Sequence, residues 1–296
     1  MESRQLVIVG GGPAGLSAAI YSSRANVDTL VIGCDPKVAG DYEIDNYFGF
    51  PEAISGRELI ERGKRQAGRF GADLDCDTVL GVHHGETGGF VVKTEKREIA
   101  CKALILATGV ARVAPKIPGL ADYEAKGVSY CVSCDGFFHR NLPVVVAGEG
   151  IFAANQALEL TTYTTDVTIV THGKKSEIKP EFTARLEQAD IPVIEAKIEG
   201  LFGDPGLSGV RLSGGRELPA HGLFIAMGAA GSSDFAQSLG LTREGAFIVA
   251  DPEQRTNIEG VFAAGDCTGG FLQISVAVGE GAKAARGAIN FLKNVE

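Results

Sequence analysis

The chain has 296 residues, a formal net charge of −9 at pH 7 and a hydrophobic fraction of 45%. This length and apolar content suffice for two domains with buried cores that fold without a scaffold of disulfides. The acidic balance argues against a general nucleic-acid-binding surface, where a basic stripe would be expected.

The first predicted unit follows the N-terminus directly. Residues 6–9 form a short apolar strand, residues 16–24 have the composition of a helix, and residues 29–32 are typical of a second strand. No cationic segment with a long apolar run precedes this unit, and no run in the chain approaches the roughly 20 apolar residues needed to cross a bilayer. We therefore expect a βαβ unit in a cytoplasmic protein with no membrane partner.

The turn from Gly10 to Gly15 fits the pattern G-x-G-x-x-G. In that pattern the first glycine turns the chain, the second admits a pyrophosphate, and the third lets the helix approach the strand. Because a strand precedes the turn and a helix follows it, the pattern predicts a dinucleotide site. Asp35 is the candidate partner for a ribose hydroxyl, although a solvated loop aspartate explains it equally well.

The chain continues with a predicted helix and two strands before a connection. Residues 59–70 have helical character, whereas residues 79–82 and 89–94 are typical of strands. The next apolar strand ends at Thr108-Gly109, and two prolines stand in the looser segment 111–119. We interpret that segment as a connection between domains.

The same order of elements then begins again. Residues 143–147 form a strand, residues 148–153 a second glycine turn, residues 154–160 a helix, and residues 167–170 another strand. This is a degenerate repeat of the first βαβ unit. The sequence therefore predicts an α/β fold of two Rossmann-like three-layer domains, the second inserted into the first.

The C-terminal part returns to the first domain. A final strand ends at Gly265-Asp266, and residues 274–292 form the closing helix. Asp266 could bind a sugar-like hydroxyl or could merely cap a helix. We expect residues 1–112 and 244–296 to form the first domain and residues 113–243 to form the inserted one.

The segment Cys131-Val132-Ser133-Cys134-Asp135 is the one most specific for chemistry. A dithiol with this C-x-x-C spacing can exchange with another protein's disulfide when a two-electron source lies beside it. A zinc site is the alternative, but it needs two further ligands at a matching spacing, so we expect no metal. The remaining cysteines have no cysteine close by in the sequence and are too few for a disulfide scaffold. They are Cys34, Cys76, Cys101 and Cys267.

Taken together, these residues resemble a known family. The chain is similar nearly end to end to the low-molecular-weight thioredoxin reductases of the pyridine nucleotide-disulfide oxidoreductase family. The segments that carry the similarity are Gly10 to Gly15, Arg24-Ala25-Asn26, Asn46, Ala107-Thr108-Gly109, Cys131 to Phe138 and Val261 to Asp266.

This resemblance implies a homodimer with FAD on the first domain and a thioredoxin-like protein as electron acceptor. It implies that Cys134 is the thiol next to the flavin, that Cys131 attacks the substrate, and that Asp135 is the nearby acid and base. The residues assigned to cofactor binding are Gly10, Gly12, Pro13, Ala14, Gly15, Asp35, Asn46, Val79, Thr108, Gly109, Gly265, Asp266, Gln273 and Ile274.

The second glycine turn departs from the family at the place where NADPH would bind. Glu149 puts a negative charge between its two glycines, and repulsion between unit charges at about 4 Å is worth roughly 1 to 4 kcal/mol. Ile151 and Phe152 add bulk at the start of the following helix. We therefore expect a degenerate NADPH site.

The segment that would grip the 2′-phosphate of NADPH also departs. Thr171-His172-Gly173 stands where the family has His-Arg-Arg, and we interpret Lys174 and Lys175 as solvated. The chain resembles in this respect the subgroup described as ferredoxin-dependent flavin thioredoxin reductases or deeply rooted thioredoxin reductases.

The leading hypothesis is an FAD-dependent disulfide reductase that acts on thioredoxin or a thioredoxin-like protein and draws electrons from a donor other than NADPH, with reduced ferredoxin as a candidate. One alternative is an ordinary NADPH-dependent thioredoxin reductase that uses Lys174 and Lys175 in place of arginines. Another is a non-catalytic, flavin-binding redox sensor.

Overall fold

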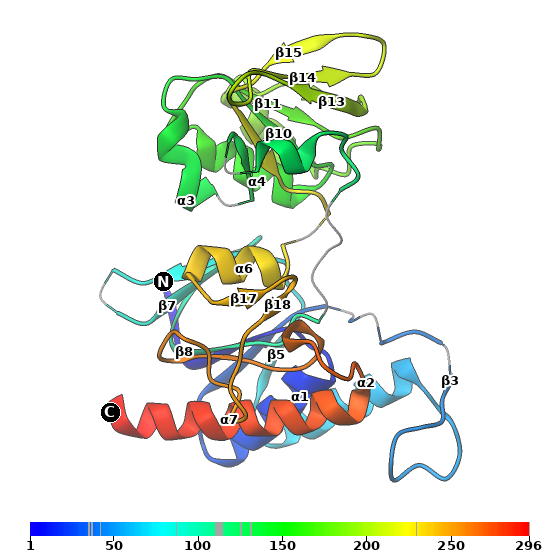
Figure 1. The fold of residues 1–296 in the computed structure, drawn as a ribbon. Coiled ribbons are helices and arrows are strands. Elements are labelled where there is room, and N and C mark those ends of the chain that lie inside the picture. Colours follow the sequence, from blue (N-terminus) through cyan, green and yellow to red (C-terminus); the bar gives the residue numbers. More distant parts are fainter. Residues whose placement is uncertain are drawn as a thin grey trace. The chain divides into compact units, whose positions relative to one another are not determined.

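The computed structural model describes residues 1–34, 36, 38–41, 43–86, 88–109, 115–124, 126–130, 132–228 and 230–295. It divides the chain into two compact units, each with its own Rossmann-like sheet, as the sequence predicts (Figure 1). Unit 1 comprises Met1–Arg112 and Gly231–Glu296, and unit 2 comprises Val113–Ala230. The chain thus returns to unit 1 at Gly231, whereas the sequence-based expectation places the return at residue 244.

Unit 1 is built on a seven-stranded sheet with the order β5-β2-β1-β8-β7-β6, and β19 pairs with β8 beside this path. The pairs among β5, β2, β1, β8 and β19 are parallel, whereas β6 and β7 run in an antiparallel hairpin. The strands are β1 (Glu2–Val9), β2 (Thr29–Ile32), β5 (Asp73–Asp75), β6 (Val79–His84), β7 (Phe90–Thr94), β8 (Glu98–Leu106) and β19 (Val261–Ala263). Two short pairs complete the unit: β3 (Glu43–Ile44) with β4 (Ile54–Ser55), and β17 (Arg243–Glu244) with β18 (Phe247–Ile248).

The helices of unit 1 are α1 (Pro13–Arg24), α2 (Gly56–Arg69), α6 (Ser232–Leu239) and α7 (Ile274–Val295). Helix α1 begins at Pro13, whose fixed φ suits the first helical position. Helices α1 and α7 pack closely because Gly281 has no side chain; a Cβ there would meet the carbonyl oxygen of Ala14. This contact holds the start of α1 against α7.

Unit 2 is built on a five-stranded parallel sheet with the order β12-β11-β10-β16-β9, next to a three-stranded antiparallel sheet that the sequence reading did not identify. All four residues of the central strand β10 are buried, as expected for a parallel strand covered on both faces. The parallel strands are β9 (Val128–Ser129), β10 (Val144–Ala147), β11 (Val167–Val170), β12 (Val193–Ile194) and β16 (Gly222–Ile225). The antiparallel strands are β13 (Ile198–Phe202), β14 (Gly209–Leu212) and β15 (Glu217–Pro219), and the helices are α3 (Val132–Asp135), α4 (Ile151–Leu160) and α5 (Pro180–Gln188).

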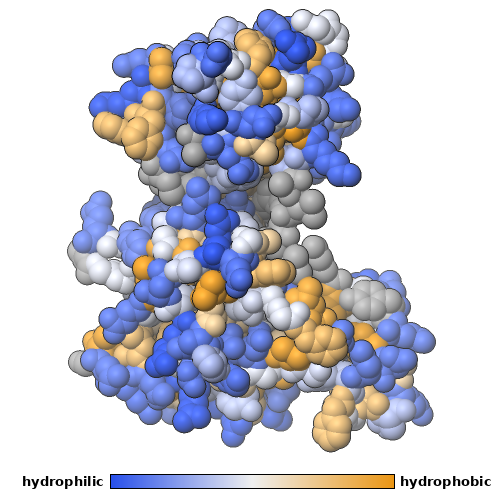
Figure 2. Space-filling model, viewed as in Figure 1, coloured by the Kyte–Doolittle hydropathy of each residue, from blue (hydrophilic) through white to orange (hydrophobic). Residues whose placement is uncertain are grey.

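The surface of each unit is largely hydrophilic on the face that Figure 2 shows, with separate hydrophobic areas between the polar side chains. Several large aromatic side chains are exposed: Phe48, Phe137, Phe138 and Phe271. Within the described ranges, no helix is both long and apolar enough to cross a membrane.

Candidate active site

The first glycine turn joins β1 to α1 and depends on the absence of side chains. Gly10 has a φ of +119°, and a Cβ there would meet the carbonyl oxygen of Ala107; a Cβ on Gly15 would meet the carbonyl oxygen of Gly10. Gly12 stands at the N-cap of α1 without a side chain that could cap the helix. The first N–H groups of α1 therefore remain available to an anion.

Two further backbone corners lie after parallel strands of the same sheet. Thr108 and Gly109 follow β8, and the Thr108 Oγ1 atom is buried without a hydrogen-bond partner. Gly265 follows β19 with a φ of +79°, and a Cβ there would lie 2.9 Å from the Cβ of Ala14. Buried hydroxyls are nearly always satisfied in folded proteins, so Thr108 indicates a missing polar partner at this edge.

Glu280 of α7 organises the corner at Gly265 and was missed by the sequence reading. Its Oε2 atom accepts hydrogen bonds from the backbone N–H of Gly265 at 2.7 Å and from the Thr268 hydroxyl at 3.2 Å. Asp266, which opens the short 3-10 helix Asp266–Thr268, is half-buried. The sequence does contain a signal for Glu280, because it is an acidic residue among the small apolar residues of the closing helix.

Other residues predicted to bind the cofactor lie nearer to or farther from the glycine turn in unit 1. The Asn46 Nδ2 atom donates to Gln273 Oε1 at 3.1 Å, directly before Ile274 begins α7. Val79 begins β6, which is three strands from β1 in the sheet order. Asp35 lies outside the described residues.

The donor set of unit 1 fits a dinucleotide such as FAD. The glycine turn leaves room for a pyrophosphate at the start of α1, and Thr108 holds an unused polar atom nearby in the same sheet. Pro13 and Ala14, which stand between the second and third glycines of the pattern, form the first two positions of α1.

The C-x-x-C segment lies in unit 2 at the start of α3. Cys131 and the side chain of Cys134 lie outside what the structure describes. Asp135 ends α3, and its Oδ2 atom accepts a hydrogen bond from the hydroxyl of Ser129 at 2.6 Å. Since Ser129 is buried on β9, this contact fixes the carboxyl group of Asp135 against the sheet.

His139 follows this segment and was also missed by the sequence reading. It is only 9% exposed, its Nδ1 atom has no hydrogen-bond partner, and its ring packs edge-on against Phe224 at 5.3 Å between centroids. Burial lowers the pKa of His139, Asp135 opposes this change, and His221 adds to it. The imidazole beside Asp135 is therefore neutral at pH 7.

The second glycine turn contains an internal ion pair. Glu149 is 4% exposed; its Oε1 atom contacts the Lys174 ammonium, and its Oε2 atom accepts from the backbone N–H of Gly228 at 3.4 Å. Burial alone would raise the pKa of Glu149, but the hydrogen bonds from Lys174 and from backbone N–H groups hold it below its ordinary value. The Lys174 side chain is exposed, as the sequence interpretation expected, but its ammonium also binds Glu149, which that interpretation did not foresee.

Three other residues of this region are buried or half-buried. Phe152, at the second position of α4, is 3% exposed, and Ile151, at the first position, is half-buried. His172 has a left-handed φ of 53°, and its Nδ1 atom accepts from the backbone N–H of Ile198 at 3.2 Å. Burial is the main cause that lowers the pKa of His172, with smaller contributions from Lys197 and Lys174.

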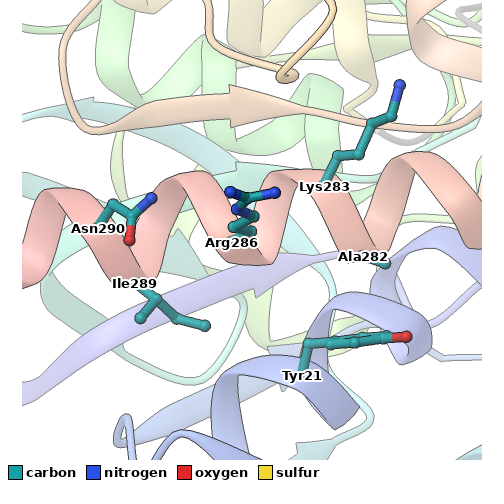
Figure 3. A pocket seen from close by; sticks show the side chains of 6 residues that line it. All are labelled: Tyr21, Ala282, Lys283, Arg286, Ile289 and Asn290. Atoms are coloured by element: carbon teal, nitrogen blue, oxygen red, sulfur yellow. The ribbon is translucent and has the colours of Figure 1, made fainter.

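A separate pocket lies on the surface of unit 1 between α1 and α7 (Figure 3). Its volume is about 360 Å³, and its lining is Tyr21, Ala282, Lys283, Arg286, Ile289 and Asn290. The Tyr21 ring extends from α1 alongside α7, whereas the Lys283 side chain extends from α7 away from Tyr21 (Figure 3). None of these residues is among those predicted to bind the cofactor or to carry the redox chemistry.

The structure corrects the sequence interpretation of two cysteines. Cys34 and Cys76, which are 42 residues apart and lack neighbouring cysteines in the sequence, form a disulfide in unit 1. Cys101 and Cys267 are free and buried, and burial raises the pKa of each thiol to about 12. The pairing was not predictable from spacing because it depends on which strands are neighbours in the sheet.

Comparison with known proteins places this geometry in a family. The profile of the pyridine nucleotide-disulphide oxidoreductases matches residues 4–281. The thioredoxin reductase of Listeria innocua serovar 6a is 34% identical over 304 residues, which span 98% of this chain and 94% of that protein.

Solved structures agree with this match. The atypical thioredoxin reductase TRi from Desulfovibrio vulgaris Hildenborough is 65% identical, with a TM-score of 0.96 over 98% of each chain. A ferredoxin-flavin thioredoxin reductase from Clostridium acetobutylicum is 28% identical, with a TM-score of 0.74 over 99% of each chain. The chain therefore belongs to the pyridine nucleotide-disulphide oxidoreductase family, as a flavoprotein enzyme of the thioredoxin-disulfide reductase type.

Proposed function

We propose that this enzyme passes electrons from FAD on unit 1 through Cys131 and Cys134 to the disulfide of thioredoxin or a thioredoxin-like protein, and that its electron donor is not NADPH. The family membership supports the disulfide reductase part. The homodimer that the resemblance implies and the cytoplasmic location expected from the sequence remain predictions.

The Glu149 carboxylate is the observation that carries the proposal about the donor. It occupies the second glycine turn as a buried anion and uses the Lys174 ammonium and the Gly228 N–H as its own partners. A dinucleotide pyrophosphate would need the same kind of donors and would have to displace this carboxylate or approach it. Like charges at such short range repel, and removal of Lys174 from a buried carboxylate is costly.

The surroundings of the turn support the same proposal. The Nδ1 atom of His172 is engaged by the backbone of Ile198, and the lowered pKa of this side chain keeps the imidazole neutral at pH 7. A neutral, engaged imidazole does not attract a 2′-phosphate. Lys174, the nearest candidate for a substitute arginine, already neutralises Glu149.

The residues around the redox pair have distinct roles in the proposed reaction. Bound FAD would supply a two-electron carrier, and Cys134 would be the thiol next to it. Cys131 would attack the disulfide of the substrate protein, and the released thiolate would take a proton. Asp135, whose carboxyl group accepts a hydrogen bond from Ser129 at 2.6 Å, would supply or remove that proton.

Anaerobic reduction of the purified yellow protein by NADPH, NADH and reduced ferredoxin in parallel tests this proposal. We expect NADPH and NADH at micromolar concentration to leave the flavin absorbance unchanged, and reduced ferredoxin is the candidate that bleaches it. The ferredoxin-flavin thioredoxin reductase with the same fold is the reason for including that donor. Rapid and complete bleaching by NADPH would instead establish the ordinary NADPH-dependent reductase.

The disulfide reductase part has its own control. Replacement of Cys131 or Cys134 by serine should abolish reduction of thioredoxin by the photoreduced enzyme, because either half of the couple is indispensable. A serine variant that still reduces the disulfide at the original rate would refute this assignment. A flavin that photoreduces without any transfer to thioredoxin would favour the redox sensor.

A further inference from the structure

The Cys34–Cys76 disulfide lies outside the redox pair of the proposed reaction. Cys34 stands two residues after the end of β2, and Cys76 directly follows β5, the neighbouring strand in the sheet. Both cysteines are exposed. Exposed disulfides are open to attack by thiolates, and in a reducing compartment they are more often labile or regulatory than structural.

This disulfide is attached to the wall of the first glycine turn. The backbone N–H of Gly33 donates to the carbonyl oxygen of Asp75 at 3.0 Å, directly beside the two cysteines. A Cβ on Gly11 would lie 3.2 Å from the Gly33 carbonyl oxygen and 3.5 Å from that of Cys34. The backbone after β2 therefore packs against the turn that would hold the pyrophosphate of FAD.

The wall continues beyond Cys34. A Cβ on Gly12 would lie 3.7 Å from the Cβ of Pro36, and a Cβ on Gly56 of α2 would meet the carbonyl oxygen of Val38. Pro36 thus lies beside the glycine turn and Val38 beside α2, and the disulfide fastens Cys34, which precedes them, to the residue after β5. Cleavage of the disulfide would remove the covalent part of this attachment.

The Lys96 ammonium favours Cys76 as the leaving thiolate. It donates to the carbonyl oxygen of Cys76 at 3.1 Å. Arg97 lies 2.7 Å from the Asp75 carboxylate, 4.0 Å from that of Asp77 and 2.8 Å from that of Glu2, so its single charge is shared among three carboxylates and Lys96 is the cation that would act on Cys76. Nearby cations stabilise a thiolate and speed its departure.

The two free cysteines provide a contrast within the same unit. Cys101 is 5% exposed and Cys267 is fully buried, and the pKa of each is raised to about 12 by burial. Such thiols are inert toward exchange and alkylation in the folded protein. Cys34 and Cys76 differ from them in being exposed, and Cys76 has the Lys96 ammonium next to it.

We propose that Cys34–Cys76 is a second thiol–disulfide exchange site, which a dithiol protein of the thioredoxin type opens and whose opening loosens the FAD-binding wall of unit 1. The partner's thiolate attacks the Cys34 Sγ atom, the bond between Cys34 and Cys76 breaks, and Cys76 leaves as a thiolate that takes a proton from water. The partner's second cysteine, having lost its proton to water, then attacks the mixed disulfide. Cys34 leaves and is protonated, so two electrons pass from the partner dithiol to this pair. Only the source of the reduced dithiol rests on the proposed function.

The exchange is tested on the FAD-loaded protein carrying Cys131→Ser and Cys134→Ser, so that the other redox pair cannot take part. A reduced thioredoxin lacking its second active-site cysteine is added in excess, the mixture is alkylated, and adducts are located by mass spectrometry. We expect a mixed disulfide on Cys34 and alkylation of Cys76, with Cys101 and Cys267 unlabelled until the protein is denatured. The absence of any adduct, or alkylation of Cys34 and Cys76 before any thiol is added, overturns the proposal.

The consequence for the flavin is measured on the same protein by retention of FAD on gel filtration, before and after exposure to a complete reduced thioredoxin. We expect FAD release to become faster by about tenfold once the disulfide is opened, because the backbone beside the glycine turn is then held by noncovalent contacts alone. Adding Cys34→Ser and Cys76→Ser should give the fast release without any dithiol and make it insensitive to thioredoxin. Equal release from the oxidised, reduced and doubly substituted proteins would refute the coupling. Because this protein lacks Cys131 and Cys134, failure of the proposed reductase activity would not affect the result.

Discussion

At the scale of single residues, the contribution of Thr108 to folding can be measured separately from its contribution to FAD binding. Its hydroxyl is buried and unpartnered in the protein alone. Thr108→Val removes that hydroxyl with little change of shape, and loss of an unsatisfied group does not destabilise a fold. We therefore expect the free energy of unfolding of the FAD-free protein to stay the same or to rise.

The same substitution should weaken FAD binding. If the Thr108 hydroxyl contacts the cofactor, its loss should raise the Kd for FAD roughly fivefold, the equivalent of about 1 kcal/mol. Titration of FAD followed by flavin fluorescence measures this change, and urea denaturation of the FAD-free protein is the control. An unchanged Kd would mean that the partner of Thr108 is a water molecule instead.

Ser129 is the residue through which β9 holds Asp135. Ser129→Ala removes the 2.6 Å hydrogen bond to the Asp135 carboxyl group and leaves the strand otherwise intact. We expect thioredoxin reduction to slow roughly tenfold, about 1.4 kcal/mol in the barrier, and its pH dependence to change shape. Ser129→Thr, which keeps the hydroxyl, should recover most of the rate. A slower Ser129→Ala enzyme with an unaltered pH profile would point to a structural role alone.

At the scale of elements, Glu149 and Lys174 join the turn before α4 to the segment after β11. The pKa of Glu149 is lower in the folded protein than its ordinary value of 4.5, so the pair stabilises the folded state above that pH. As the pH falls from 4.5 through the lowered pKa, the carboxylate is protonated and this stabilisation is lost. We expect Glu149→Gln to be less stable than the original protein at pH 7 and the difference to shrink in acid.

Urea denaturation followed by circular dichroism between about pH 3 and pH 7 measures this difference. Lys174→Met is the matched variant: it leaves Glu149 without its cation, so the pKa of Glu149 rises toward or above its ordinary value, and the variant should be less stable at pH 7 and lose less stability in acid than the original protein. Identical pH dependence in the original and Glu149→Gln proteins would show that the ion pair does not contribute to stability.

The elements also show where sequence patterns suffice. The strands and helices around both glycine turns were predictable because apolar runs, glycine spacing and helix starts are local signals. The three-stranded antiparallel sheet of unit 2 was missed because its strands are short and only partly buried, as in the half-exposed β13. The Cys34–Cys76 bond and the contact of Glu280 with Gly265 are set by the order of strands and by helix packing, which spacing alone does not encode.

At the scale of the whole molecule, the chain passes from unit 1 to unit 2 and back again. Each unit has its own network of stabilising contacts. A ligand that binds only the folded form of one unit stabilises that unit by mass action. FAD should therefore increase protection from hydrogen exchange in residues 1–109 and 231–295, above all at the glycine turn and the start of α1. NADPH should leave the exchange of residues 148–177 unchanged if Glu149 keeps its partners.

Hydrogen exchange with mass spectrometry on the FAD-free protein, with and without each nucleotide, measures both effects at once. The Glu149→Gly variant is the informative comparison, because it replaces the internal carboxylate by the smallest residue and releases the Lys174 ammonium from its pair. Protection of the second glycine turn by NADPH in this variant alone would identify Glu149 as the group that excludes the nucleotide. Protection already in the original protein would contradict the proposed donor, whereas protection in neither would assign the exclusion to the engaged His172 and the missing arginines.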